Sequence, residues 1–92
     1  MANINVKIPT PFRKFTAGEA TVAVEGGTIA EALESLEAKH PGVKAKLCDD
    51  AGKLRRFINV YANQDDIRFL DNLDTTLDDG DEVTIVPAIA GG

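Results

Sequence analysis

The chain has 92 residues, of which 43% are hydrophobic and 27% charged, a composition typical of one globular domain rather than of a disordered segment. Ten basic and fifteen acidic residues give a net charge of −5, which disfavours general binding to nucleic acid or to an anionic membrane. The first residues lack the apolar core of a signal peptide, no apolar run is long enough to span a membrane, and the one cysteine cannot form an internal disulfide. We therefore expect a soluble cytoplasmic domain that is monomeric when free.

Charge is unevenly distributed along the chain. Residues 39–56 contain six basic and two acidic side chains, a local charge of +4, whereas residues 64–92 contain eight acidic side chains and one basic, a local charge of −7. Such blocks are either two solvated surfaces or a pattern that steers the protein toward a partner of complementary charge.

The first predicted elements are two strands. Apolar and polar side chains alternate over residues 3–8 and again over residues 20–24, a period of two that is typical of strands with one buried face. Prolines at positions 9 and 11 end the first strand, because proline donates no hydrogen bond to a sheet. The two strands predict an antiparallel hairpin, whose inward side chains would be Ile4, Val6, Ile8, Val22 and Val24.

A helix is predicted from Thr28 to about His40. The double glycine at 26–27 breaks the preceding strand, and Thr28 followed by Glu31 fits a capping box. The Pro-Gly pair at 41–42 ends the helix. Apolar side chains recur between these limits at the spacing of one helix face, namely Ile29, Ala32, Leu33 and Leu36.

The second half of the chain predicts shorter elements. We expect a helical turn at residues 43–47, a strand at 57–62, a short edge strand at 67–69 and a last strand at 82–87. The core positions in this half would be Ile58, Val60, Ala62, Leu70, Leu73, Leu77, Val83 and Ile85.

This order of elements predicts an α+β domain over residues 1–87. A hairpin, one amphipathic helix and further strands would bury the apolar face of the helix on one side of a mixed sheet, which is the β-grasp or ubiquitin-like roll. Residues 88–92 are expected to form a flexible tail ending Gly-Gly.

Side chains suited to catalysis are few. The chain has one His, one Cys and one Ser, so we expect no intrinsic catalysis, no bound cofactor and no bound metal. His40 is expected to cap the helix, and Cys48 to be a plain small residue whose pKa, if shifted, is raised. The double glycine at 26–27, expected to form a turn, lacks the Lys-Ser/Thr pair of a phosphate-binding loop, and the acidic residues 71–81 lack the spacing of an EF-hand.

The last residues indicate a different kind of chemistry. The last predicted strand leads directly into Ala88-Ile89-Ala90-Gly91-Gly92. A glycine pair has no Cβ to obstruct it, so an extended Gly91-Gly92 can pass through a narrow channel and present the Gly92 carboxylate to the active site of another protein. The alternative is a frayed tail of small residues.

Three stretches resemble the ThiS/MoaD family of ubiquitin-like sulfur carriers, and the resemblance covers nearly the whole chain. They are residues 27–29 (GTI) at the helix start, residues 77–83 (LDDGDEV) before the last strand and residues 87–92 (PAIAGG) at the terminus. Residues 56–61 (RFINVY) and the Pro-x-x-x-Gly-Gly ending are most similar to the CysO-type branch, which carries sulfur for cysteine biosynthesis.

The resemblance implies that Gly92 is the reactive residue and that partner enzymes supply the catalysis. An E1-like adenylating enzyme, using ATP and Mg²⁺, would convert the Gly92 carboxylate into an acyl-adenylate, which a sulfur donor would turn into a thiocarboxylate. In the cysteine branch the acceptor would be an aminoacrylate on a PLP-dependent cysteine synthase, and a peptidase would release the product.

Three other functions remain open. The chain could be the small subunit of molybdopterin synthase, bound to the large subunit, or a ubiquitin-like modifier conjugated through Gly92 to target lysines. Ubiquitin-type modifiers have basic residues just before Gly-Gly, whereas this chain has no charged residue after Glu82. A plain interaction domain with an incidental Gly-Gly is the third.

A docking surface is expected on the outward face of the sheet. Strand periodicity places Phe57 and Tyr61 beside Val86, and exposed apolar patches often mark docking sites. The apolar tail, with Ile89, would enter a groove of the partner. The alternative is a loop that folds over these side chains.

Overall fold

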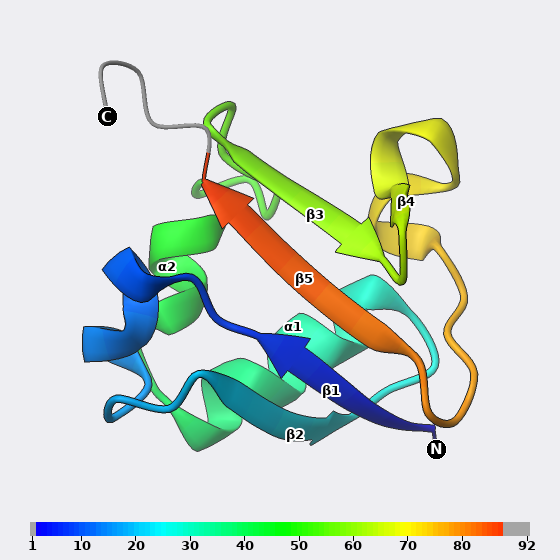
Figure 1. Ribbon diagram of the computed structural model, residues 1–92. Coiled ribbons are helices and arrows are strands. Elements are labelled where there is room, and N and C mark those ends of the chain that lie inside the picture. Colours follow the sequence, from blue (N-terminus) through cyan, green and yellow to red (C-terminus); the bar gives the residue numbers. More distant parts are fainter. Residues whose placement is uncertain (1, 88–92) are drawn as a thin grey trace.

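The computed structural model describes residues 2–87, and its centre is a five-stranded mixed sheet (Figure 1). The strand order is β2-β1-β5-β3-β4, in which β1 and β5 are parallel and the other neighbours are antiparallel. The predicted mixed sheet of an α+β fold is confirmed. The strands are β1 (Asn3–Lys7), β2 (Thr21–Glu25), β3 (Ile58–Ala62), β4 (Asp65–Asp66) and β5 (Glu82–Pro87).

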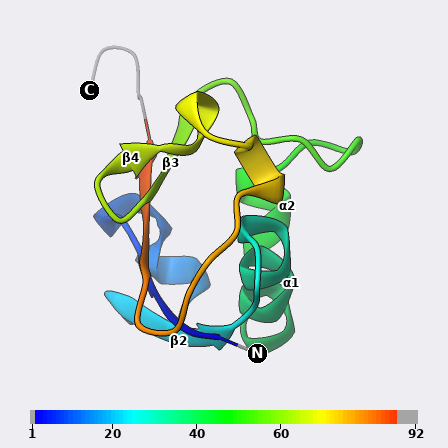
Figure 2. The ribbon, with the colours of Figure 1, turned by 90° about the vertical axis from the view of Figure 1, so that its right-hand side faces the viewer.

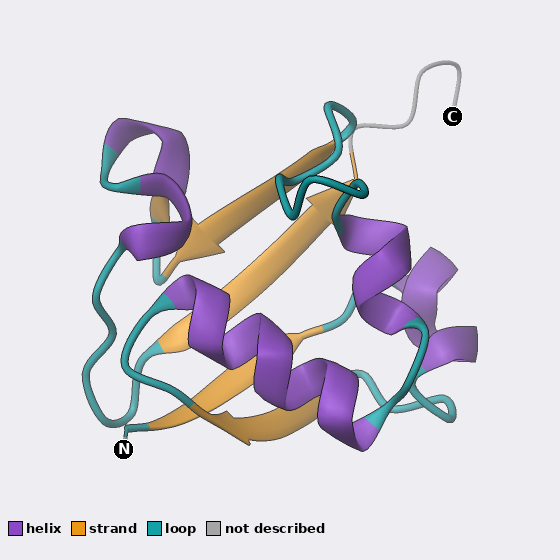
Figure 3. Ribbon diagram, turned by 180° about the vertical axis from the view of Figure 1, so that it is seen from behind, coloured by secondary structure: helices purple, strands orange, loops and turns teal. Residues whose placement is uncertain are grey.

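Helices cover one face of this sheet. Figure 3 shows α1 (Ile29–Lys39) lying across the strands, and Figure 2 shows α1 and α2 (Val43–Leu47) on the same side of the sheet. The short 3-10 helices are η1 (Thr10–Phe15), η2 (Ile67–Phe69) and η3 (Asn72–Asp74). None of the helices within residues 2–87 is both long and apolar enough to cross a membrane.

The hairpin of β1 and β2 forms as the alternation predicts. Exposed and buried residues alternate along both strands, and the antiparallel register places Ile4 opposite Val24 and Val6 opposite Val22. These four side chains are at most 3% exposed. One face of the hairpin therefore supplies the floor of the core on which α1 packs.

The predicted start and apolar face of α1 are also confirmed. The Thr28 hydroxyl accepts a hydrogen bond of 3.2 Å from the Glu31 amide. The Glu31 carboxylate accepts one of 2.7 Å from the Gly27 amide, one residue before the position of a standard capping box. The apolar residues of this face, none more than 1% exposed, are Ile29, Ala32, Leu33 and Leu36.

Gly26 is required for a reason that the sequence does not reveal. The double glycine ends β2 as predicted, yet neither Gly26 nor Gly27 has the positive φ of a left-handed turn. Instead, a Cβ on Gly26 would lie 2.7 Å from the backbone nitrogen of Ala32 and 3.0 Å from the carbonyl carbon of Glu31. Gly26 therefore allows the first turn of α1 to approach the end of β2 closely.

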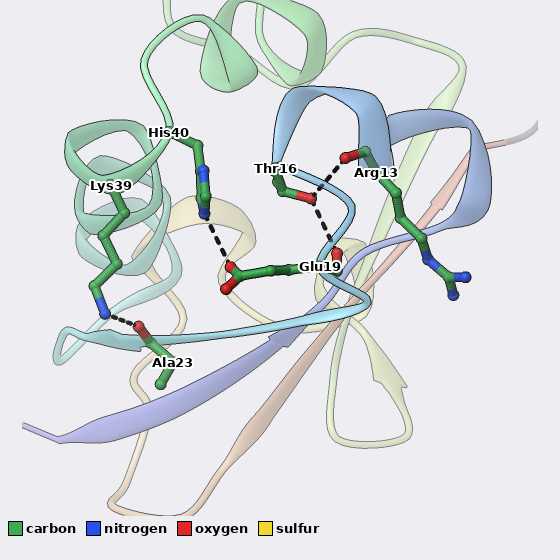
Figure 4. Close-up of polar contacts among 6 residues, drawn as sticks. All are labelled: Arg13, Thr16, Glu19, Ala23, Lys39 and His40. Atoms are coloured by element: carbon green, nitrogen blue, oxygen red, sulfur yellow. Dashed lines mark hydrogen bonds and ion pairs between the residues drawn. The ribbon is translucent and has the colours of Figure 1, made fainter.

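The C-terminal end of α1 is joined to the connection between β1 and β2 (Figure 4). The His40 backbone amide donates to the Leu36 carbonyl at 2.9 Å, which confirms the predicted cap, and its Nε2 lies 3.1 Å from Glu19 Oε2. The Lys39 ammonium donates to the Ala23 carbonyl. The buried Thr16 hydroxyl lies 3.0 Å from the Glu19 carbonyl oxygen, which orders the same connection from within.

The prediction of an edge strand at residues 67–69 is wrong. The edge strand β4 is Asp65–Asp66, and residues 67–69 form η2. The Asp66 carboxylate accepts a hydrogen bond of 2.9 Å from the Arg68 amide, and this local bond turns the chain out of the extended conformation. Leu77 is buried and Leu73 partly buried as expected, but Leu70 is 42% exposed and is not a core residue.

Candidate functional site

The strand that leads to the predicted reactive terminus is β5. It lies between β1 and β3, with Val83 and Ile85 buried at 0% and 3% exposure, and its last residue, Pro87, pairs with Ile58. Because β5 is hydrogen-bonded on both sides, the point from which the chain continues beyond Pro87 is fixed relative to the sheet. The predicted tail, residues 88–92 with Ile89, Gly91 and Gly92, lies outside the described residues.

Val86 of the predicted docking surface lies on the sheet face opposite α1, because the neighbouring Ile85 is buried in the core. Val86 is 39% exposed, Tyr61 is partly buried, and Phe57, which is 57% exposed, lies in the turn just before β3. The register pairs Val86 with Asn59, which is two residues from both Phe57 and Tyr61 in the sequence. No loop among residues 2–87 buries Phe57 or Val86, and a role in docking remains a prediction.

Two further exposed apolar residues, Phe69 and Leu70, were missed near Tyr61. Phe69 is 84% exposed, and it lines a shallow hollow together with Leu70 and Tyr61. The sequence analysis expected Phe69 in an edge strand at residues 67–69 and Leu70 in the core. We refer below to the outer apolar surface, which comprises Phe57, Tyr61 and Val86.

An ion pair holds the turn that exposes Phe69. The Arg68 guanidinium donates to both carboxylate oxygens of Asp66, at 3.2 Å from Nε to Oδ1 and 2.8 Å from Nη2 to Oδ2. The Arg68 side chain is 62% exposed and the Asp66 side chain 8% exposed. This contact lowers the pKa of Asp66 and raises that of Arg68, so both groups are charged at neutral pH. The Asp-x-Arg spacing is the sequence signal that could have revealed the turn.

Cys48 is a buried thiol just after α2. It is 4% exposed, and burial raises its pKa, although the nearby charges of Lys44 and Arg55 oppose that shift in part. The predicted direction of the shift is therefore confirmed. A buried, protonated thiol at neutral pH is a poor nucleophile, so Cys48 is not suited to carry sulfur.

Substituting Cys48 is expected to affect stability but not sulfur chemistry. In Cys48→Ser a hydroxyl replaces the thiol in a mostly apolar site, which should lower the free energy of unfolding by about 1–2 kcal/mol. The fraction of folded Cys48→Ser that acquires a thiocarboxylate should equal that of the parent, as measured by intact mass. Loss of loading in correctly folded protein would place the sulfur on the side chain instead, and Cys48→Ala provides the matched control without a hydroxyl.

Metal binding has no structural basis in the part of the chain that is described. Within residues 2–87 no three His, Cys, Asp or Glu side chains are grouped so that they could hold an ion. The outer apolar surface offers side chains for recognition of a partner, a role that remains a prediction.

The comparisons with known proteins cover almost the full chain. The model of the ThiS family matches residues 6–92. The sulfur carrier protein CysO of Mycobacterium tuberculosis is 45% identical over 92 residues, which is 98% of this chain and 99% of the relative. The small archaeal modifier protein 3 of Haloferax volcanii is 38% identical over 68 residues, 74% of this chain and 73% of the relative.

The structural comparison agrees with the sequence comparison. A chain in the crystal structure of the Amycolatopsis orientalis BexX/CysO complex superposes with a TM-score of 0.91 and 46% identity, covering 97% of this chain and 99% of that one. The predicted β-grasp fold is confirmed by this match.

Proposed function

Since this chain belongs to the ThiS family, we propose that it is a sulfur carrier protein and that its Gly92 carboxylate is the group that carries the sulfur. The observation that supports this most strongly is the 45% identity to a sulfur carrier protein over nearly the entire length of both chains. The family match extends to residue 92, so it includes the Gly91-Gly92 pair.

The proposed chemistry begins with activation of Gly92 by a partner. A carboxylate is a poor electrophile at neutral pH, so an E1-like adenylating enzyme would join its oxygen to the α-phosphorus of ATP and release pyrophosphate, with Mg²⁺ held by that enzyme. Hydrosulfide, supplied by a sulfur donor, then attacks the acyl carbon, a C–S bond forms, the C–O bond to AMP breaks, AMP departs, and the sulfur loses its proton. The product is a thiocarboxylate, a soft nucleophile attached to a protein.

The proposed destination of this sulfur is cysteine biosynthesis. The 45% identity to the sulfur carrier protein CysO over nearly the whole of both chains supports this branch. The thiocarboxylate sulfur would attack an electrophilic amino-acid substrate held by a PLP-dependent cysteine synthase. An S-to-N acyl shift would then leave cysteine amide-linked to Gly92, and a peptidase would hydrolyse that amide.

The described residues would contribute binding and positioning to this cycle. The central strand β5 fixes where the tail departs, and the outer apolar surface beside it offers side chains that a partner can desolvate. The BexX/CysO complex, in which a similar chain is found, supports partner binding as the mode of action.

Introducing a charge at Val86 is expected to weaken partner binding without unfolding the domain. Val86 is 39% exposed, so an aspartate there stays hydrated in the free protein. In an apolar interface it would lose that hydration at a cost of roughly 2 kcal/mol, or about 30-fold in affinity. Titration of the adenylating enzyme with Val86→Asp measures the loss, and thermal melts measure the stability.

Ala23→Asp is the matched control for this substitution. It places the same charge on an exposed position of the same sheet, but on the edge strand β2. Equal affinities for Val86→Asp and the parent would remove Val86 from the docking surface. A large fall in melting temperature would contradict its outward orientation.

A second candidate function is protein modification through Gly92. It is favoured by the 38% identity to a small archaeal modifier protein. In that case an amine of a target lysine, rather than sulfur, displaces AMP from the adenylate. A third, the small subunit of molybdopterin synthase working with its large subunit, shares the thiocarboxylate and differs only in the acceptor.

Reconstitution with the adenylating enzyme of the same cell tests the proposal. The chain is incubated with that enzyme, Mg-ATP, a sulfur donor and cell extract, and two products are measured by mass spectrometry. A carrier gains one sulfur in place of one oxygen and forms few conjugates, whereas a modifier forms amide links to lysines. Transfer to a purified cysteine synthase, compared with the molybdopterin synthase large subunit, then distinguishes the two sulfur pathways.

A further inference from the structure

Basic residues are concentrated in three segments of this acidic protein. Seven of its ten Lys and Arg residues lie in η1, in α2 and in residues 48–57, which together contain two acidic residues, Asp49 and Asp50. These segments therefore have a net charge of +5, and the remainder of the chain has a net charge of −10. The seven residues, called the basic end below, are Arg13, Lys14, Lys44, Lys46, Lys53, Arg55 and Arg56.

The topology brings these segments together where β5 ends. β1 is parallel to β5, so η1, which follows β1, begins at the same end of the sheet. β3 is antiparallel to β5, so residues 48–57, which precede β3, also lie there, and Ile58 pairs with Pro87. Figure 1 shows α2 and the blue η1 near this end of the sheet, whereas β4 and the yellow η3 lie on the other side.

The positive charges of the basic end are not neutralised within the described residues. Of the seven side chains only Lys44 forms an ion pair there, with Glu34. Arg55 donates from Nε and Nη2 to the Ala45 carbonyl at 3.1 and 2.9 Å, which fixes the guanidinium without cancelling its charge.

Two further cations contact the same aromatic ring. The Lys14 and Lys46 ammonium groups each lie 5.3 Å from the centre of the Phe15 ring. The electron-rich face of an aromatic ring attracts cations, so Phe15 joins η1 and α2 through two like charges. The structure thus presents a positive surface to the solvent where β5 ends.

We propose that the basic end faces an acidic surface on the adenylating enzyme, around the entrance through which the tail reaches ATP. This inference rests on the proposed function. A protein with a net charge of −5 is repelled as a whole by an acidic partner, but a charge separation of this kind turns its positive end toward that partner during approach. The end from which the tail departs would then arrive first, and association would be faster than random orientation allows.

Charge reversal at Arg56 tests this inference against a matched control. Arg56 and Lys39 are both exposed, and a change of either to glutamate alters the net charge by the same amount. Arg56 lies next to the start of β3, whereas Lys39 contacts Ala23 on the edge strand β2, two strands away from β5. Lys53→Glu is a second reversal within the basic end.

Association rates with the adenylating enzyme are measured by stopped flow at low and high salt. At low salt Arg56→Glu and Lys53→Glu should slow association about 3- to 10-fold and Lys39→Glu by less than about twofold, with the difference lost in about 0.5 M salt. Equal slowing by all three variants, or faster association of Arg56→Glu, would overturn the inference.

ATP–pyrophosphate exchange at saturating enzyme separates this inference from the proposed function. The reversal variants should reach the exchange rate of the parent, because the inference concerns approach and not chemistry. If the parent supports exchange but Arg56→Glu and Lys53→Glu slow association no more than Lys39→Glu does, the inference alone is overturned. A parent that neither binds nor supports exchange overturns both.

Discussion

A chain that lacks Gly92, or that has one extra residue after it, should lose sulfur loading completely and still melt at the temperature of the parent. The buried side chains of β5, Val83 and Ile85, precede this position, so we expect the changes to leave the core of residues 2–87 intact. The two changes would instead move the reactive carboxylate. One residue shifts the carboxylate by about 3.3–3.6 Å, and a displacement of about 1 Å can already reduce a rate of order a hundredfold.

ATP–pyrophosphate exchange with the adenylating enzyme measures this effect directly. Ala88→Ser keeps the chain length and both terminal glycines and serves as the control, because it leaves the carboxylate at the same distance along the chain. It should retain measurable exchange, whereas the shortened and extended chains should have none. Exchange at the parent rate in the shortened chain would show that Gly92 is not the activated residue.

Among alanine substitutions at the described glycines, Gly26→Ala should destabilise the fold most. The new Cβ would lie 2.7 Å from the Ala32 nitrogen and 3.0 Å from the Glu31 carbonyl carbon, and both are backbone atoms of α1. Moving the helix away from β2 would loosen the packing of Leu33 and Leu36 on the sheet. We expect the free energy of unfolding to fall by about 2–3 kcal/mol.

Gly27→Ala provides the comparison in urea unfolding. Its Cβ would meet only the flexible end of the Glu31 side chain, at 3.2 Å from Oε1. That side chain can shift, and a less flexible unfolded chain offsets part of the cost, so the change should stay within about 0.5 kcal/mol. Equal losses in the two variants would contradict the close approach of α1 to Gly26.

The parts of the fold that depend on local patterns could be predicted from the sequence. Alternation identified β1, β2, β3 and β5 with their buried faces, because one face of each packs on the same core. The Thr28 cap and the Pro-Gly stop bounded α1 to within one residue. Local sequence carries these features because the interactions that form them span four residues or fewer.

Two kinds of feature could not be predicted from local sequence. One depends on contacts between distant segments, and the other on a side chain that forms a hydrogen bond with a nearby backbone group in place of a strand partner. The Asp66 carboxylate turned residues 67–69 into η2 and exposed Phe69 and Leu70, although their apolar character suggested a buried edge. The requirement at Gly26 appears only when α1 lies against β2. The convergence of η1, α2 and residues 48–57 at one end needs the parallel pairing of β1 with β5, which no local pattern encodes.

For the candidate site, the exposure predicted for Phe57 and Val86 is confirmed, whereas the burial of Cys48 appears only in the structure. The roles of Phe57, Tyr61, Val86 and Ile89 in docking, and of Gly91 and Gly92 in the chemistry, stay predictions. Their outcome depends on a second protein, so neither the composition nor the fold of this chain can decide it.

The intact mass of the protein purified from its own cells, followed by fragmentation of its last residues, shows whether Gly92 carries sulfur. We expect a population in which one oxygen is replaced by sulfur, with the added mass located on Gly92 and absent from Cys48. We also expect an alkylating reagent for thiocarboxylates to label the same residue. A protein whose sulfur is found on Cys48, or whose Gly92 occurs only as a free carboxylate or in amide links to lysines during active cysteine synthesis, would contradict the account.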